Sequence, residues 1–371
     1  MGIYKRCAIF GASVSGEKCL YSLENQVSIE CFFDNRVNGK FHGYDVRRPM
    51  YDKGLFILVA VGNYLLVREQ LFELGYSEFK DFCPYDVFLK KIVVIYGNCH
   101  AHAVKQYLIR NISFAKEYGI YPLPAIQDMP DSFDYSGIMR NCDLFIHQSV
   151  RENNIYGRKY ASAELIQYST KKCEIISIPN LYGMGKCFFP QLSQGTGYRG
   201  KMPLFHYDTN VRQWIREGKT KDDMKKKIQL GGIYNKESIG NSWNIFIKKV
   251  EEREKDWDVK ILDYIMKKYQ LEKLFCDPWH ISSILVREIA RRTLEFMGIK
   301  VDIPYILPMM DDLEVFIYED VKNALDLKFE EKYIRVFSKV RVVGTMDLNI
   351  DEYLCQLIDF TVRYGITENE G

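Results

Sequence analysis

Short apolar runs alternate with stretches of helical periodicity in the first quarter of the chain. The apolar runs cover residues 7–10, 28–33 and 55–61, and helical patterns follow at 17–24 and 64–74. A last short run lies beyond Gly75. Strands that alternate with helices predict a parallel sheet.

The same alternation starts again at residue 92. Apolar runs at 92–96, 118–123, 142–148 and 173–178 predict four strands, with helices at 101–110 and 161–170 between them. Pro122 cannot donate to a sheet ladder, so we expect its strand at an edge. The restart predicts two domains, residues 1–89 and 90–371.

Beyond Pro190 the pattern becomes mainly helical. Amphipathic periodicity predicts helices at 211–217, 222–229, 242–254, 259–268, 281–297, 319–327 and 350–364. The chain as a whole therefore reads as an α/β protein whose second domain carries extra helices.

Composition narrows the classes of function. A net charge of +2 gives no electrostatic case for a nucleic-acid partner, and no apolar stretch is long enough for an integral membrane segment. The ten cysteines are spaced singly without a C-x-x-C pair, which predicts neither a metal site nor disulfides. Scattered free thiols are typical of a cytoplasmic protein.

Cys99 is the candidate nucleophile. It follows the strand 92–96 and the turn Gly97-Asn98, and a helix begins just after it. The first residues of a helix lie at the positive end of its dipole, which favours the reactive thiolate. The alternative is a small buried cysteine that only fills the core.

Two later features complete a catalytic set with Cys99. Asp277 and His280 are three residues apart in a turn before a long helix, so the carboxylate is placed to orient the imidazole. Asn180 follows the strand 173–178 and offers an amide donor for an oxyanion. The carboxyl ends of parallel strands meet at one edge, so Asn98, Gln148 and Asn180 are expected to border one cleft.

This order resembles the SGNH-type hydrolases and acyltransferases, with a nucleophile after the first strand, a middle Asn and a late Asp-x-x-His. Cysteine replaces their serine, which favours acyl transfer without excluding hydrolysis. The domain from residue 90 is more closely similar to the WcbI-type polysaccharide biosynthesis family of bacterial capsule loci. The resemblance is carried by Gly97-Asn98-Cys99, Gln148–Arg151, Ile178–Tyr182, Phe189-Pro190, Ser242, Arg253-Glu254 and Phe275–His280.

The WcbI resemblance implies an acetyltransferase that uses acetyl-CoA. Cys99 and His280 would be catalytic, and Asn180 would assist them. His100 stands where the family often has Gln, and the Asp277 turn replaces a more usual Asn-His-Pro. Asp277 is therefore our choice for the third member by spacing, with Glu254 as its competitor. The coenzyme is expected to be held by Asn98, His100, Gln148, Arg151, Tyr182 and Arg253.

The first domain resembles the small Rossmann-like domain in front of bacterial sugar acyltransferases. The matching residues are the glycine-containing turn from Gly11 to Gly16, Phe32–Asn35 and His42–Val46. The resemblance implies a nucleotide or nucleotide-sugar site at Gly11, Ser13, Gly16 and Asp34. Ser13 stands where a dinucleotide motif would have glycine, which weakens the case for hydride chemistry. The alternative is a module that only packs or dimerises.

We therefore expect a small Rossmann-like parallel sheet followed by a larger SGNH-like α/β domain. The predicted activity is acetyl transfer from acetyl-CoA to a hydroxyl of a glycan or nucleotide-sugar acceptor. One alternative is a glycan esterase or deacetylase with the same residues, and a second is a non-catalytic nucleotide-sugar-binding protein. The sequence leaves a homo-oligomer open.

Overall fold

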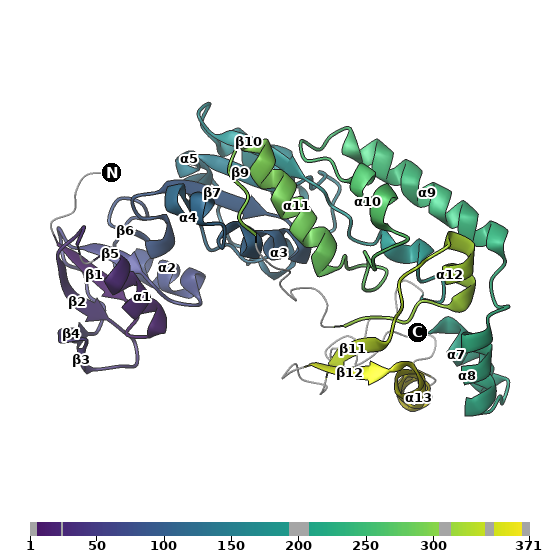
Figure 1. Cartoon of the computed structure of the whole chain (residues 1–371). Helices are drawn as coiled ribbons and strands as arrows, with labels where there is room; N and C mark the ends of the chain where they lie inside the picture. Colours follow the sequence, from purple (N-terminus) through teal and green to yellow (C-terminus); the bar gives the residue numbers. More distant parts are fainter. Residues whose placement is uncertain (1–5, 24, 193–207, 304–312, 338–344, 366–371) are drawn as a thin grey trace. The chain divides into compact units, whose positions relative to one another are not determined.

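The computed structural model describes residues 6–23, 25–192, 208–303, 313–337 and 345–365 (Figure 1). Helices and parallel-paired strands make up a mixed α/β protein, which confirms the predicted fold class. In the part of the chain described here, no helix combines the length and the apolar character needed to cross a membrane.

The first sheet has six strands in the order β3–β4–β2–β1–β5–β6. Only β3 runs antiparallel, against β4. Helices α1 (Val14–Leu23) and α2 (Tyr64–Glu73) follow β1 and β5, as predicted. The β3–β4 hairpin was not predicted, because its residues form no apolar run. The strands are β1 (Cys7–Phe10), β2 (Ile29–Phe33), β3 (Gly39–Phe41), β4 (Tyr44–Arg47), β5 (Phe56–Val59) and β6 (Phe82–Pro84).

The second sheet has the order β10–β9–β7–β8. Its strands are β7 (Lys91–Tyr96), β8 (Tyr118–Ile120), β9 (Leu144–Gln148) and β10 (Glu174–Ile178). β7 pairs in parallel with β8 and β9. β8 lies at the edge and ends before Pro122, so the predicted edge position is confirmed.

Helices connect and follow the second sheet. They are α3 (Cys99–Leu108), α4 (Ile112–Glu117), α5 (Ser136–Asn141), α6 (Ser162–Tyr168), α7 (Thr209–Arg216), α8 (Lys221–Leu230), α9 (Lys236–Glu254), α10 (Leu262–Lys268), α11 (Ser283–Phe296), α12 (Glu319–Leu325) and α13 (Ile350–Phe360). An antiparallel pair, β11 (Tyr333–Phe337) and β12 (Thr345–Asn349), was not predicted. Charged residues interrupt both strands, so neither gives a continuous apolar signal.

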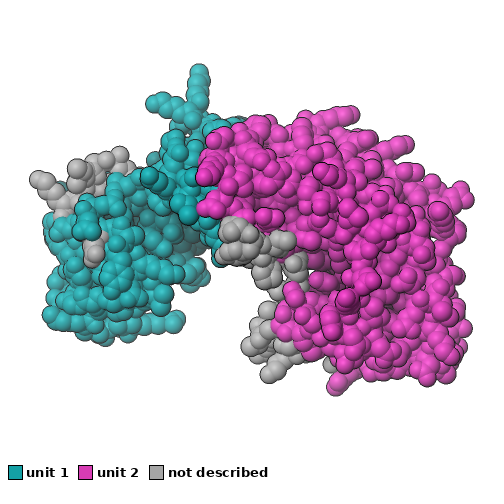
Figure 2. Space-filling view, viewed as in Figure 1, with its two compact units in different colours: residues 1–102, 109–176 teal, residues 103–108, 177–371 magenta. Residues whose placement is uncertain are grey.

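The chain forms two compact units (Figure 2). Unit 1 comprises residues 1–102 and 109–176, and unit 2 comprises residues 103–108 and 177–371. Within unit 1, one apolar core includes Phe32 and Ile57 of the first sheet together with Val94 and Phe145 of the second. The predicted boundary at residues 89 and 90 falls between the two sheets, and the division into domains 1–89 and 90–371 stays a prediction.

A buried carboxylate joins the two sheets of unit 1. Glu78 accepts hydrogen bonds from Tyr64 and Arg68 of α2, the latter at 2.9 Å, and from Tyr121 beyond β8 at 2.6 Å. The side chains of Arg68 and Glu78 are 8% and 6% exposed. The Arg68 guanidinium also lies over the Phe133 ring, 4.9 Å from its centroid. Buried charges need such partners, since desolvation is otherwise costly.

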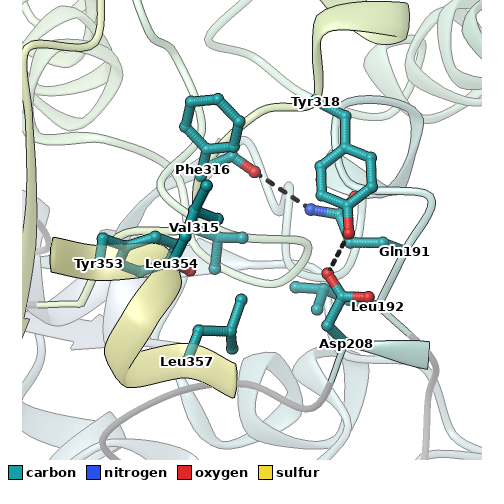
Figure 3. Close-up of a pocket in the computed structure, with 9 residues that line it drawn as sticks. All are labelled: Gln191, Leu192, Asp208, Val315, Phe316, Tyr318, Tyr353, Leu354 and Leu357. Atoms are coloured by element: carbon teal, nitrogen blue, oxygen red, sulfur yellow. Dashed lines mark hydrogen bonds between the residues drawn. The ribbon is translucent and has the colours of Figure 1, made fainter. Parts of the chain in front are cut away.

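A second buried carboxylate, Asp208, lies in unit 2. It caps α7 by accepting the N–H groups of Asn210 (2.9 Å) and Val211 (3.0 Å), and its other oxygen accepts from the Tyr318 hydroxyl at 2.6 Å (Figure 3). Burial raises the pKa of Asp208 to about 6, although these donors favour the charged form. A small cavity beside it is lined by Gln191, Leu192, Val315, Phe316, Tyr318, Tyr353, Leu354 and Leu357.

Replacing Glu78 with glutamine should destabilise unit 1. The substitution keeps the side-chain size but leaves the buried Arg68 guanidinium without its buried counter-charge, a change that typically costs about 3–5 kcal/mol. We expect a clear fall in the urea midpoint. Glu30→Gln, which breaks the exposed pair with Arg6, is the control and should leave the midpoint nearly unchanged. Equal effects of the two substitutions would contradict this role of Glu78.

Asp208 should make stability decrease as the pH rises. Its folded pKa lies above its ordinary value of 3.8, so the folded state holds this proton more tightly than the unfolded state. The resulting stabilisation, about 3 kcal/mol, is complete below pH 3.8 and is lost as the pH rises through about 6. Urea unfolding of the wild type and Asp208→Asn between these pH values should show the steeper fall in the wild type. Parallel profiles would disprove the assignment.

Candidate active site

The turn between β7 and α3 places Cys99 at the first position of the helix. Gly97 has φ +153°, and a Cβ there would lie 2.5 Å from Gln148 Oε1 and 2.9 Å from the Ala101 side chain. Gln148 comes from the end of β9, and its Oε1 accepts the Asn98 N–H at 3.0 Å. Only glycine allows this close approach. Gln148 of the neighbouring strand β9 therefore holds the turn in place.

The residues around Cys99 differ in their exposure to solvent. Cys99 is half-buried, whereas His100 and Gln148 are each 1% exposed. Asn98 Oδ1 accepts the His100 N–H at 2.9 Å, which closes the first turn of α3. Arg151, beyond β9, is exposed. The structure thus brings together Asn98, Cys99, His100 and Gln148, and it gives Asn98 and Gln148 roles in shaping the turn.

The Asp277-x-x-His280 segment forms the tip of a short hairpin in unit 2. Phe275 and Ile281 pair across it, and the Cys276 N–H donates to the His280 carbonyl at 3.0 Å. The side chain of Asp277 is 1% exposed, while that of His280 is 35% exposed. A buried carboxylate therefore lies directly beneath a half-exposed imidazole.

Backbone and side-chain donors hold the Asp277 carboxylate. Oδ1 accepts the N–H groups of Trp279 (2.6 Å) and His280 (2.8 Å), and Oδ2 accepts from His280 Nδ1 at 2.8 Å. Since an ionised carboxylate only accepts, Nδ1 carries the proton, and Nε2 is the ring nitrogen that takes up another. This is the arrangement of an oriented general base.

Glu254, the alternative to Asp277 as the third catalytic residue, caps a helix instead. Its Oε1 accepts the N–H groups of Ile261 and Leu262, the latter at 2.8 Å, and so caps α10. The geometry favours Asp277 as the partner of His280, while the catalytic role of either residue stays a prediction.

The loop after β10 packs against the hairpin. Gly185 donates its N–H to the Pro278 carbonyl at 3.0 Å, and a Cβ on Gly185 would lie 2.7 Å from the Asp277 carbonyl oxygen. The Tyr182 ring meets the His280 ring edge-on, with centroids 6.0 Å apart. Gly185 was missed in the sequence analysis, although the run Gly183-Met184-Gly185 after a strand signals a tight loop.

Asn180 and Arg253 belong to the same neighbourhood. Asn180 Oδ1 accepts the Tyr182 N–H at 3.2 Å, and its carbonyl accepts from Arg253 Nη1 at 3.1 Å. Unit 2 therefore brings together five predicted site residues, namely Asn180, Tyr182, Arg253, Asp277 and His280. The predicted cleft shared by Cys99 and His280 stays a prediction.

The candidate nucleotide residues of the first sheet also have defined contacts. Gly11 has φ +119°, and a Cβ on Gly16 would lie 1.9 Å from the Gly11 carbonyl oxygen. The Ser13 carbonyl accepts the Glu17 N–H at 2.9 Å in the first turn of α1. Each residue thus helps to shape the turn, and nucleotide binding there stays a prediction.

Asp34 clamps this turn through backbone contacts. Its carboxylate accepts the N–H groups of Ala12 (2.9 Å), Arg36 (2.7 Å) and Val37 (2.9 Å). Burial opposes its charge, but these donors outweigh that effect and hold the pKa of Asp34 below its usual 3.8. Among the described residues, no group of three or more His, Cys, Asp or Glu side chains is arranged to hold a metal ion.

Comparisons with known proteins match the chain to a protein family and to a solved structure. The family model described as polysaccharide biosynthesis enzyme WcbI matches residues 92–302, more than half of the 371 residues. A search of curated proteins found no match.

A solved structure described as WcbI, a novel polysaccharide biosynthesis enzyme, shares the fold. It represents the native protein without a disulfide bond between coenzyme A and one of its cysteines. Sequence identity is 18%, the TM-score is 0.60, and the match covers 74% of this chain and 90% of that one. On the strength of the family match, the chain belongs to the WcbI family of polysaccharide biosynthesis enzymes.

Proposed function

We propose that this protein transfers an acetyl group from acetyl-CoA to a sugar hydroxyl during polysaccharide biosynthesis. The observation that carries the proposal is the hydrogen bond of 2.8 Å between His280 Nδ1 and the buried Asp277 carboxylate. It orients an imidazole for proton transfer, which acyl transfer to a hydroxyl requires. Membership of a polysaccharide biosynthesis family supports a sugar as the acceptor.

Coenzyme A as the acyl carrier has separate support. The solved WcbI structure is described in terms of coenzyme A and a cysteine, and Cys99 is a half-buried cysteine at the start of α3. In our proposal Arg151 and Arg253 bind coenzyme phosphates, which guanidinium groups match in geometry. Asn98, His100, Gln148 and Tyr182 form the rest of the coenzyme site.

Two routes lead to the same product. In the direct route, His280 Nε2 removes the proton of the sugar hydroxyl, whose oxygen attacks the thioester carbonyl. The C–S bond then breaks, and the departing CoA thiolate takes the proton from His280. In the covalent route, the Cys99 sulfur first attacks the thioester carbonyl, the C–S bond to CoA breaks, and the CoA thiolate takes up the Cys99 proton. The sugar oxygen, deprotonated by His280, then attacks the acetyl-Cys99 carbonyl, and the Cys99 thiolate leaves and takes the proton from His280. Asn180 and the Cys99 N–H are the proposed donors to the oxyanion.

A nucleotide-sugar acceptor would give the first sheet a role. We propose that the turn from Gly11 to Gly16, together with Asp34, holds the nucleotide part of such an acceptor. The acidic residue after β2 and the helix N-terminus after β1 support this assignment.

Asp277→Asn should lower the rate of acetyl transfer roughly 100- to 10,000-fold. The amide keeps the side-chain shape but no longer stabilises a protonated His280. Initial rates are followed by CoA release from acetyl-CoA in the presence of a sugar acceptor, and calorimetry should show unchanged CoA binding. Glu254→Gln is the control and should retain a nearly normal rate. A larger loss in Glu254→Gln than in Asp277→Asn would refute the assignment.

Cys99→Ala should abolish turnover and leave CoA binding intact if the covalent route operates. Mass spectrometry of the wild type after incubation with acetyl-CoA alone should then place an acetyl group on Cys99. Cys355→Ala, which removes another half-buried cysteine, is the matched control. Nearly normal transfer by Cys99→Ala would remove the covalent route and leave the direct one.

A further inference from the structure

Two cysteines lie together in unit 1, away from the candidate active site. Cys142 follows α5 and precedes β9, and Cys173 precedes β10 (Figure 1). Both are at the amino ends of neighbouring strands, whereas Cys99 follows the carboxyl end of β7 and Gln148 is the last residue of β9. The pair thus belongs to the opposite edge of the sheet.

The backbones of the two cysteines are held close. The Glu174 N–H donates to the Asp143 carbonyl at 2.9 Å, so the residues just after the two cysteines belong to one ladder. Neighbouring strands lie about 4.8 Å apart, within the separation of about 4.4–6.8 Å that a disulfide requires. Cys142 is the C-terminal capping residue of α5 and lies outside β9. Its side chain therefore need not point alternately to one face of the sheet, as the side chains within a strand do.

Both thiols donate to backbone carbonyls at this end of the sheet. Cys142 Sγ lies 3.1 Å from the Leu144 carbonyl oxygen and 3.8 Å from that of Ile92, and Cys173 Sγ lies 3.5 Å from that of Glu174. Cys142 is 3% exposed, whereas Cys173 is half-buried, so a reagent from solvent meets Cys173 first.

We propose that Cys142 and Cys173 form a redox-active dithiol that reacts with low-molecular-weight disulfides. The Cys173 thiol loses its proton, and the resulting thiolate attacks one sulfur of the reagent RSSR. The S–S bond breaks, and the thiolate that leaves takes up a proton in place of the one that Cys173 lost. Cys142 then attacks the Cys173 sulfur, expels the second thiolate and gives it its proton. The protein gains one disulfide, and two RSH are released.

The electrostatics of the pair match this order of attack. The neighbouring Cys142 thiol lowers the pKa of the Cys173 thiol, against the effect of its burial. The neighbouring Cys173 and burial raise the pKa of Cys142, which therefore keeps its proton. An accessible thiolate next to a protonated thiol is the usual arrangement of an attacking and a resolving cysteine.

The test treats the reduced full-length protein with oxidised glutathione and then alkylates the remaining thiols under denaturing conditions. Peptide mapping should show Cys142 and Cys173 leaving the alkylated pool together as one cross-linked peptide, which dithiothreitol restores. The oxidised protein should also melt at a higher temperature than the reduced one, because the link constrains the unfolded chain. Cys355, half-buried beside the Asp351 carboxylate, is the internal reference for an ordinary thiol.

Single substitutions separate the two roles. Cys142→Ser should stop at a mixed disulfide between Cys173 and glutathione, and Cys173→Ser should leave Cys142 reduced. The proposal is overturned if Cys142 and Cys173 both stay alkylatable while Cys355 reacts. It is also overturned if the mixed disulfide at Cys173 persists in the wild type. The wild-type mapping decides the matter even if a variant does not fold.

Discussion

The buried carboxylate of Asp277 is the constraint on which the candidate site depends. Two backbone N–H groups and the His280 ring donate to this carboxylate and stabilise a charge in this buried position. Those donors are available only in a tight turn, and the pairing of Phe275 with Ile281 forms that turn. The need to satisfy one carboxylate thus determines both the shape of the hairpin and the orientation of the imidazole.

Glycines let the surrounding segments approach. Gly185 brings the loop after β10 against the hairpin, and Gly97 lets Gln148 reach the turn before Cys99. A methyl group at either position would meet atoms closer than 3 Å. The chain therefore places its candidate nucleophile and its candidate base with the same device, a glycine that admits a neighbouring backbone or amide.

Local pattern was sufficient for the apolar strands of the two sheets and for the Asp277–His280 pair, because a run of apolar residues and a spacing of three are local signals. It was not sufficient for the β3–β4 hairpin, whose residues form no apolar run. Long-range partners were not predictable in this way. The contact between Asp208 and Tyr318 joins residues 110 positions apart. The sequence near either residue contains no pattern that predicts this contact. The strands β11 and β12 are stabilised by pairing with each other, and a charged residue inside each one interrupts the apolar signal. The choice of Asp277 over Glu254 needed the structure, which shows Glu254 capping α10.

The proposed activity is the transfer of an acetyl group from acetyl-CoA to a sugar hydroxyl. The most direct measurement therefore follows the acetyl group itself. Acetyl-CoA with an isotopically labelled acetyl group is incubated with the protein and a mixture of nucleotide sugars and glycans, and the products are identified by mass spectrometry. The predicted result is labelled acetate esterified to a sugar hydroxyl, formed by the wild type and lost in His280→Ala. Release of free labelled acetate as the sole product, whichever sugar is present, would contradict the account.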